Sequence, residues 1–404
     1  MNVALKAFPQ HVLPALAEPD LLPFGMARLA THLFRGEPYA PLEAALLARL
    51  AKNPFDAGAL HDLATLIQLV GHEGKGLEVL QKALTLSRMF RLPAPQGATD
   101  PVRLLMFAVP GNFMTNMPVD FLIMDRPVQL DIVYLVPGEP FPDFLPEHDV
   151  VLVGIAEGDA AQGVLLELGA RLAVWPKPVL NMPSRIMLAG REMLPEAIGR
   201  VEGVLVPAVR RASREVLAAC ALPASAYPML VRPCGSHAGQ GLGKIDDAAA
   251  VGAYLAAEIA PQYFVSPFID YSSADGLFRK YRITAAGGRF LPCHVAISSH
   301  WMVHYLNAGM AESAAKRAEE AEAIATFDKG FGLRHGPALA GIAQALDLDY
   351  FSIDCAEMQD GRLVVFEAGT AMIVHQMEAP ELYPYRKPAI DAICDAFTGL
   401  LTRG

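Results

Sequence analysis

The first quarter of the chain has apolar residues three and four positions apart, the period of a helix that buries one face. The pattern runs from Pro41 to Phe90. It is broken at 52–58 and again at 71–76, where glycine and charged residues gather, with a proline in the first break. This pattern predicts short helices separated by turns, and we expect residues 1–96 to form a helical region.

Two of these predicted helices, in residues 57–86, resemble a single tetratricopeptide repeat. The repeats of such proteins bury their apolar faces against neighbouring repeats, so one repeat cannot bury both of its faces alone. We therefore expect this TPR-like region to pack on the rest of the chain rather than to form a free peptide-binding array. The apolar positions of the pair are Leu60, Leu63, Ala64, Ile67, Leu80, Ala83 and Leu84.

Beyond a turn-rich boundary at 95–101, short apolar runs alternate with helical patterns. Alternation of this kind predicts a parallel sheet covered by helices, that is, a Rossmann-like α/β domain. We assign it to residues 97–187. The predicted strands are 102–109, 129–136 and 148–155, and a helix is predicted at 160–172.

From residue 188 to 404 the pattern changes to an α+β arrangement with antiparallel strands. A helix at 212–220 leads into a strand at 227–233 and a glycine-rich loop. The loop has neither the spacing of a P-loop nor that of a dinucleotide-binding fingerprint. The later predicted elements are a helix at 246–259, strands at 263–270 and 278–299, helices at 311–331 and 337–347, and a terminal hairpin at 349–370.

The terminal hairpin carries the strongest chemical signal of the chain. Asp360 and Gly361 stand between two β-rich runs and are typical of a two-residue turn. Two carboxylates facing each other among apolar neighbours repel, and a bridging Mg²⁺ would relieve that repulsion. The other interpretation is an exposed acidic pair on a solvated sheet face. The turn predicts that Asp354 lies opposite Glu367, Ala356 opposite Val365 and Met358 opposite Leu363, all on one face.

The order of these motifs resembles the ATP-grasp superfamily, in particular ligases of the glutathione synthetase ATP-binding-like and RimK-like kind. The likeness covers about residues 100–400: a strand ending in Arg-Pro, a Gly-Ser-His-x-Gly loop, a hinge strand, a "KYRI" strand and the acidic hairpin. It implies a preATP-grasp domain at 97–187 and an ATP-grasp domain of two α+β subdomains at 188–404. It also implies ATP and Mg²⁺ as cofactors, and amide or peptide-like bond formation between a carboxylate and an amine through an acyl phosphate.

The resemblance also assigns roles to individual residues. Asp354 and Glu367 correspond to the metal-binding acids, and Arg282 and Arg232 to cations that neutralise phosphate charge during transfer. The phosphates and the nucleoside would be bound by Arg191, Arg232, Gly235, Ser236, His237, Gly239 and Gln240, by the hinge residues Val265, Ser266, Pro267 and Phe268, and by Asp270 or Asp275 at the ribose.

Three departures from the family pattern involve four positions. Gly369 stands where asparagine is usual, arginines replace both expected lysines, and Lys280 stands where an acid often precedes the arginine. Glycine supplies no side-chain ligand, so a second Mg²⁺ would bind weakly or through water. Two alternatives stay open: a catalytically impaired nucleotide-binding or scaffold protein, and a small-molecule kinase of the same fold.

A cluster of histidines and aromatic residues follows the "KYRI" strand, where this family often shapes its acceptor-substrate pocket. Its candidates for substrate contact are His294, His300, Trp301 and His304, and His375 follows the hairpin. On a helix, the spacing of His300 and His304 would also suit zinc, although strand or loop context and ordinary packing are alternatives.

Composition narrows the class of protein. The net charge of −10 argues against a general nucleic-acid surface, and no apolar run has the length of a membrane span. Five widely separated cysteines have no metal-binding spacing and are typical of reduced thiols. We expect a cytoplasmic enzyme that acts on small-molecule or peptide carboxylates and amines, with a homodimer as a candidate assembly.

Overall fold

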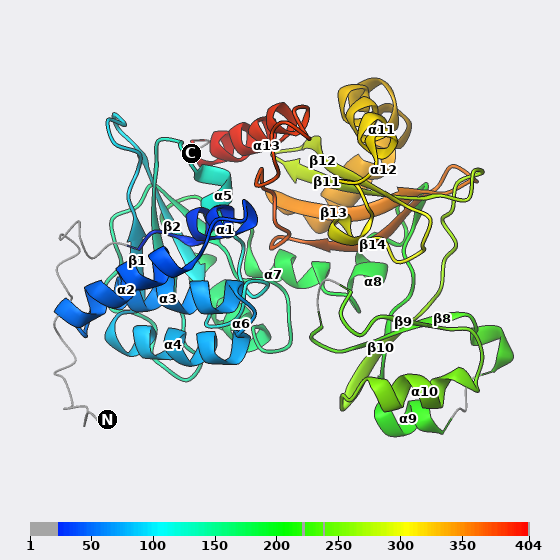
Figure 1. Cartoon of the computed structure of the whole chain (residues 1–404), viewed down its shortest axis with the longest axis horizontal. Coiled ribbons are helices and arrows are strands. Elements are labelled where there is room, and N and C mark those ends of the chain that lie inside the picture. Colours follow the sequence, from blue (N-terminus) through cyan, green and yellow to red (C-terminus); the bar gives the residue numbers. More distant parts are fainter. Residues whose placement is uncertain (1–22, 220–222, 237–238, 403–404) are drawn as a thin grey trace.

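The computed structural model describes residues 23–219, 223–236 and 239–402, which form three β-sheets with helices packed around them (Figure 1). The N-terminal helices lie at one end of the molecule. The second sheet, the smallest of the three, projects at the other end (Figure 1). None of the described helices combines the length and the apolar character needed to cross a membrane.

Four helices occupy the described part of the N-terminal region, residues 23–96, in agreement with its apolar periodicity. The third begins at a cap residue, Asp56, whose carboxylate accepts a hydrogen bond from Ala59 N at 2.8 Å. The pair resembling a repeat does not stand alone, because its apolar face joins a core with Leu104 and Leu130 of the first sheet. The helices are α1 Met26–Phe34, α2 Ala40–Lys52, α3 Ala57–Leu69 and α4 Glu73–Leu86.

The first sheet has the strand order β1-β3-β2-β4-β5, and its pairings are parallel except for β1 with β3. The sequence pattern did not predict β1, which lies in the segment expected to be helical. Its strands are β1 Met89–Leu92, β2 Val102–Ala108, β3 Val128–Tyr134, β4 Val150–Val153 and β5 Val179–Leu180, with α5 Val119–Ile123, α6 Gln162–Leu172, α7 Pro183–Ile186 and α8 Leu194–Ile198.

The second sheet is antiparallel and has the order β7-β10-β8-β9. Its apolar core includes Met229, Val231 and Tyr263 and is separate from the cores of the other two sheets. The glycine-rich loop connects β8 to β9, which pair with each other. The elements are β7 Arg210–Ser213, α9 Arg214–Ala218, β8 Met229–Pro233, β9 Gly243–Ile245, α10 Ala250–Ala257 and β10 Gln262–Pro267.

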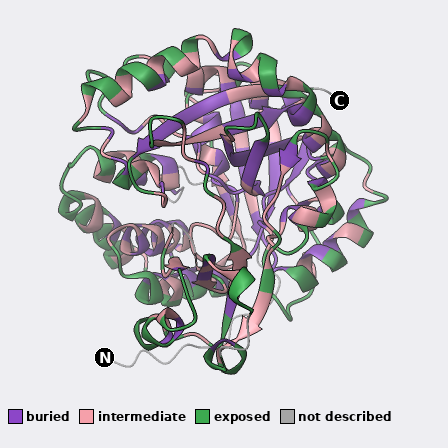
Figure 2. Cartoon of the chain, turned by 90° about the vertical axis from the view of Figure 1, so that its right-hand side faces the viewer, coloured by how far each residue is buried: buried purple, intermediate pink, exposed green. Residues whose placement is uncertain are grey.

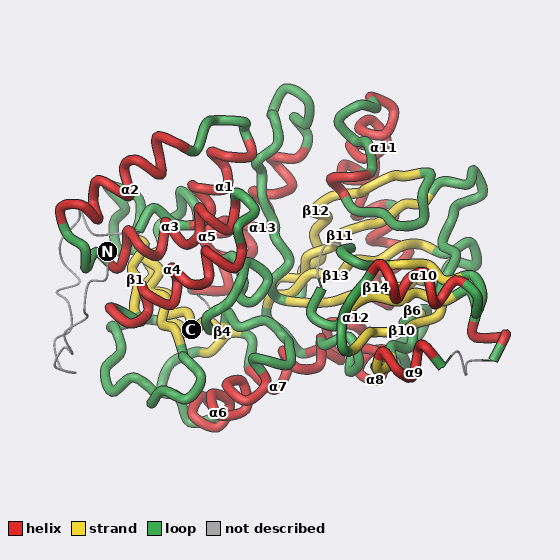
Figure 3. The backbone as a smooth tube through the Cα atoms, turned by 60° about the horizontal axis from the view of Figure 1, so that its bottom comes forward, coloured by secondary structure: helices red, strands yellow, loops and turns green. Residues whose placement is uncertain are grey.

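The third sheet has the order β12-β11-β13-β14-β6 and is antiparallel except for the pairing of β14 with β6. Figure 3 shows its strands beside those of the second sheet, and Figure 2 shows that its strands are largely buried. The terminal helix α13 was not predicted. The elements are β6 Val204–Leu205, β11 Phe278–Ala286, β12 Arg289–Ser298, α11 Ala314–Ala325, α12 Phe331–Leu346, β13 Tyr350–Glu357, β14 Leu363–Gly369 and α13 Arg386–Leu401.

The acidic hairpin, β13–β14, has the predicted central pair but not the predicted turn. Asp354 lies opposite Glu367. Met358 N donates to Arg362 O at 2.8 Å, so the turn has three residues, 359–361, instead of two. A bulge at Phe366 then shifts the register back, and the two offsets cancel at the acids.

The other two predicted pairs of the hairpin are wrong, because they lie between the turn and the bulge. Cys355 pairs with Val365, and Ala356 pairs with Val364. Val365 therefore packs with Cys355 in the core shared with the first sheet, and not beside Asp354. Leu363 pairs with Glu357 instead of Met358.

Candidate active site

A cavity of about 510 Å³ lies between the second and third sheets and extends to helix α1. It has a hinge end at β10, a charged centre at β11, β13 and β14, and an apolar far end at α1 and the segment 371–378, which follows β14. Among its described lining residues there are five arginines and lysines and three acids, an excess of positive charge. The cations are Arg191, Arg232, Lys280, Arg282 and Arg386, and the acids are Asp354, Glu367 and Glu378.

The hinge end is formed by the last residues of β10 and the loop after it. Ser266, Pro267 and Phe268 line the cavity as predicted. The side chain of Val265 packs instead into the core of the second sheet. The rings of Phe268 and Trp301 meet edge-on with their centroids 5.7 Å apart, and they form an apolar surface at this end of the cavity.

Asp354 is the most buried acid of the cavity, with 1% of its surface exposed. Arg282 donates from Nε to Oδ1 at 2.7 Å and from Nη2 to Oδ2 at 3.1 Å, and Lys280 donates to Oδ2 at 2.9 Å. Burial raises the pKa of Asp354, but Arg282 and Lys280 outweigh burial and hold that pKa well below its usual range. Arg282 and Lys280 are two residues apart on β11, so their side chains share one face of the sheet.

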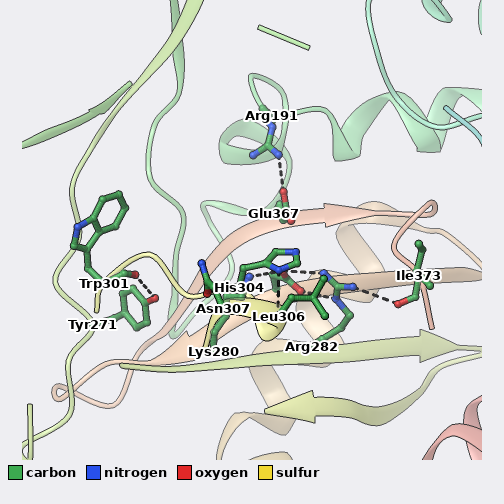
Figure 4. Close-up of polar contacts among 11 residues, drawn as sticks. Arg191, Tyr271, Lys280, Arg282, Trp301, His304, Leu306, Asn307, Glu367 and Ile373 are labelled. Atoms are coloured by element: carbon green, nitrogen blue, oxygen red, sulfur yellow. Dashed lines mark hydrogen bonds and ion pairs between the residues drawn. The ribbon is translucent and has the colours of Figure 1, made fainter. Parts of the chain in front are cut away.

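Glu367 is bound from the other side, by a residue of the segment between η2 (Met187–Ala189) and α8 (Figure 4). Arg191 Nη2 donates to Glu367 Oε2 at 2.6 Å. Burial raises the pKa of Glu367, but Arg191 and the other cations lower that pKa by more than burial raises it, so the carboxylate is ionised. The structure thus brings the predicted metal acids and three predicted or neighbouring cations into one cluster.

Arg232 differs from the other cations of the cavity because it has no carboxylate partner. Its guanidinium donates to Ser236, at Oγ (3.2 Å) and at the backbone carbonyl. Burial and the nearby charge of Arg191 lower the pKa of Arg232 to about 10. A half-buried cation without a carboxylate partner among the described residues is a favourable place for an anionic ligand.

The glycine loop leaves β8 directly after Arg232. Gly235 and Gly239 have φ angles of 77° and 76°, a left-handed conformation that favours glycine. Gly239 lines the cavity, whereas Gln240 is exposed and does not. His237 lies outside the described residues. Cys234 has its pKa raised by burial, so its thiol is not activated.

Three predicted contacts are not brought to the cavity. Asp275 is exposed and forms a bidentate ion pair with Arg279 (2.9 and 2.8 Å). Asp270 is exposed and accepts a hydrogen bond from Ser272 N. His300 is exposed, and its Nδ1 accepts from Met302 N, so it does not share a helix face with His304 as a zinc pair would.

The remaining predicted substrate residues line the cavity. Trp301 is at the hinge end, and His294 packs on Tyr305 with ring centroids 4.7 Å apart. Burial lowers the pKa of His304 and, well below its usual value, that of His294. Burial lowers the pKa of His375 to about 4. These histidines are therefore neutral at pH 7.

Sequence reasoning missed several residues around this cavity. Glu378 and Arg386 form a buried ion pair at the far end, and Phe34 of α1 lines the same end. Glu157 lies behind Glu367, and burial together with Glu367 raises its pKa to about 8. A sequence signal existed only for Glu157, which follows the carboxyl end of a predicted parallel strand, where binding sites gather.

Glu157 also occupies space beside Gly369. A Cβ added at Gly369 would lie 3.3 Å from Glu157 Oε1. The other oxygen, Oε2, is buried and has no hydrogen-bond partner among the described residues. The place where relatives are expected to carry an asparagine is thus next to a carboxylate from the first sheet.

The donor set fits a divalent cation, although no group of three or more acids, histidines and cysteines in the described part of the chain is close enough to enclose one. Asp354 and Glu367 face each other across the hairpin, and Glu157 Oε2 adds an orphaned carboxylate oxygen nearby. Mg²⁺ ordinarily takes one or two carboxylates and completes its shell with phosphate and water oxygens. The two hairpin acids satisfy that requirement.

Comparison with known proteins finds similarity among solved structures only. No protein-family model and no curated protein matches the chain. D-alanine–D-alanine ligase from Bacillus anthracis, solved with ATP, is 15% identical, with 75% of this chain and 97% of that chain covered and a TM-score of 0.42. A RimK domain ATP-grasp protein from Sphaerobacter thermophilus is 16% identical (74% and 100% covered, TM-score 0.39). VanG D-Ala:D-Ser ligase from Enterococcus faecalis is 12% identical (75% and 100% covered, TM-score 0.45). At these scores the assignment of function depends on the site itself.

Proposed function

We propose that the protein is an ATP-dependent ligase of the ATP-grasp type, which activates a carboxylate as an acyl phosphate and joins it to an amine. The observation that carries the proposal is the cluster at the centre of the cavity. Asp354 and Glu367 face each other there, and Lys280, Arg282 and Arg191 converge on them. Such a cluster suits phosphoryl transfer, which needs positioning and charge neutralisation rather than a reactive side chain.

The parts of the cavity divide the work of that reaction. The apolar surface formed by Phe268 and Trp301 would pack against the adenine, next to the end of β10. Arg232 would bind the phosphates, since it has no carboxylate partner, and the loop after it would cover them. Arg282 would stabilise the transferred group, because a guanidinium donates to two phosphate oxygens at once.

The carboxylates of Asp354 and Glu367 would hold Mg²⁺. The ion supplies neutralisation of charge on the phosphate oxygens. Asp354 and Glu367 already pair with Lys280 and Arg191, so they would have to share their carboxylates between these cations and the metal. We therefore expect the nucleotide, whose phosphates can take up the cations, to bind together with the metal.

Isothermal titration with a non-hydrolysable ATP analogue, AMP-PNP, tests the proposal. With Mg²⁺ present, Arg232→Gln should weaken binding about 10- to 100-fold, because a hydrogen bond to a charged group is worth about 1.5–3 kcal/mol. Asp354→Asn should remove the enhancement of binding by Mg²⁺. The control is Asp360→Asn, an exposed acid in the turn of the same hairpin. Equal affinity with Mg²⁺ and with EDTA, or full affinity of Arg232→Gln, would contradict the proposal.

A nucleotide-binding protein without turnover is the second candidate. It is favoured by the ion pairs that already occupy both acids and by the missing side chain at Gly369. An assay of ADP release with carboxylate and amine pairs separates the two. A ligase releases ADP only with a competent pair, a kinase leaves a stable phosphorylated product, and a binding protein releases none.

A further inference from the structure

The far end of the cavity is not part of the nucleotide site, and its charges are already paired. Arg386 and Glu378, both more than nine-tenths buried, form an ion pair with each other. His375 Nδ1 lies 3.6 Å from the second oxygen of Glu378, and the low pKa of His375 keeps its ring neutral. Arg386 Nε and Glu378 Oε2 have no hydrogen-bond partner among the described residues, but the charges of the pair cancel, so a further charged group placed here would be buried without a counter-charge, which is costly.

The other side chains of the far end are apolar. They come from three separate parts of the chain: Phe34 from α1, Met114 from the loop after β2, and Met372, Ile373 and Met377 from the segment after the hairpin. Methionine side chains are flexible and polarisable, so a wall of this kind adapts to apolar ligands of different shape.

Helix α1 is anchored so that Phe34 has a defined position. Asp62 of α3 accepts hydrogen bonds from Phe24 N (2.5 Å) and Gly25 N (3.2 Å), and Asp120 accepts one from Ala27 N (2.6 Å). These bonds satisfy backbone donors at the start of the helix, which would otherwise lack partners.

The face of α1 that includes Ala27 and Ala30 then packs on Ile373 and Met377. Phe34, seven residues beyond Ala27, extends that face to the cavity, where its ring lies 5.8 Å from the ring of His375.

The charged centre and the apolar end adjoin each other. Arg282, which pairs with Asp354, also donates from Nη1 to the carbonyl of Ile373 at 3.3 Å (Figure 4). A carboxylate held near Arg282 would therefore have the apolar wall directly beside it.

From this arrangement we infer that the carboxylate substrate is a monocarboxylic acid with an uncharged apolar chain, and that Phe34 of the N-terminal helical region sets the chain length it accepts. The inference rests on the proposed ligase function. It gives the N-terminal helices a role in the site, as one wall of the substrate pocket.

Chain-length preference tests the inference with defined probes. Butanoate, hexanoate, octanoate and the dicarboxylate glutarate are supplied with ATP, Mg²⁺ and hydroxylamine as the amine. A carboxylate oxygen attacks the γ-phosphorus and ADP leaves. Hydroxylamine nitrogen then attacks the acyl carbon, phosphate leaves, the nitrogen loses a proton, and the hydroxamate is measured.

Three results are expected. The wild type prefers hexanoate to glutarate. Phe34→Ala opens the end of the pocket and raises the octanoate-to-butanoate ratio of kcat/KM about tenfold, because a methylene contact changes kcat/KM by about 10-fold or more in such pockets. Phe34→Trp narrows the end of the pocket and lowers that ratio. Opposite shifts in the two variants would not arise from a folding defect. The matched control is Phe144→Ala, an exposed phenylalanine that does not line the cavity.

Binding experiments separate failure of the inference from failure of the ligase proposal. Titration of hexanoate and glutarate, with and without AMP-PNP, needs no turnover. If AMP-PNP binds in an Mg²⁺-dependent way but glutarate binds as tightly as hexanoate, or Phe34 variants leave the length preference unchanged, the inference is overturned and the ligase proposal stands. If AMP-PNP does not bind, the ligase proposal fails, and the substrate inference fails with it.

Discussion

At the scale of single residues, burial decides which charged groups are structural and which are available to a ligand. Asp354 is buried and matched by Arg282 and Lys280, whereas the half-buried Arg232 has no acid partner among the described residues. Glu320 illustrates the limit of sequence reasoning. Its segment has charges at helical spacing, a pattern typical of a solvated helix face. In the structure Glu320 is fully buried and accepts hydrogen bonds from Tyr305, Tyr385 and Val295 N.

Asp354→Asn should destabilise the fold by about 3–5 kcal/mol at pH 7, because two buried cations lose their shared acid. The folded-state pKa of Asp354 lies below its unfolded value, so the stabilisation is present above that unfolded value of about 3.9 and is lost as pH falls through the folded value. The free energies of unfolding of the wild type and of Asp354→Asn, measured in urea at a series of pH values, should therefore begin to converge as the pH falls below about 4. A constant difference down to strongly acid pH would contradict the ion-pair explanation.

At the scale of elements, the acidic hairpin shows how two local irregularities preserve one functional pair. The three-residue turn and the bulge at Phe366 each move the register by one residue, in opposite senses. The hairpin also meets the first sheet, where Glu157 fills the space beside Gly369. That contact explains in physical terms why a side chain at 369 is unfavourable in this chain.

Gly369→Asn should lower the free energy of unfolding by about 1–3 kcal/mol, because the added side chain overlaps Glu157. Shortening the neighbour in the double variant Glu157→Ala, Gly369→Asn should recover most of that loss. Chemical denaturation of the wild type, both single variants and the double variant forms a double-mutant cycle. Additive effects, with no coupling between the two positions, would show that Glu157 does not occupy that space in solution.

At the scale of the whole molecule, the described part of the second sheet has an apolar core of its own, and polar contacts connect it to the remainder. Arg211 on β7 forms one such connection. It donates to Asp159, which follows β4 (2.5 and 3.0 Å), and to Glu192, which follows Arg191 (2.6 and 3.0 Å), while its guanidinium lies 5.1 Å from the ring centroid of Phe264. Ion pairs at the surface thus connect the second sheet to the rest of the molecule.

Arg211→Met keeps an apolar chain over Phe264 but removes the ion pairs. The free energy of unfolding should change by no more than about 1 kcal/mol, as is usual for exposed pairs. Hydrogen exchange of the segments 207–213 and 262–268 should become faster, because the second sheet moves more freely against the rest. The control is Arg334→Met. Arg334 lies on α12 and forms an exposed ion pair with Glu357 of β13, so its loss should leave the hydrogen exchange of those segments unchanged. Unchanged exchange in Arg211→Met would show that this network does not hold the sheet.

Much of the fold and of the candidate site follows from local pattern. Periodicity predicted helices in the N-terminal region, three alternating strands of the first sheet and the strand β8 that precedes the glycine loop. Turn chemistry predicted that Asp354 and Glu367 face each other. The strand β1 and the helix α13 were both missed. In the case of β1 the reason is that the strand is short and completes a sheet whose other strands lie beyond it in the chain.

The sequence by itself determined the alternation of elements and the acidic pair, since both depend on neighbours a few residues apart. Only the tertiary structure decided what surrounds that pair. Arg191, Glu157 and Phe34 lie far from the hairpin in the chain and reach it because the sheets and α1 pack together. No local pattern encodes such contacts, because side chains meet across elements according to how the cores pack. The same packing placed Asp275 and His300 at the surface, away from the cavity they were expected to line.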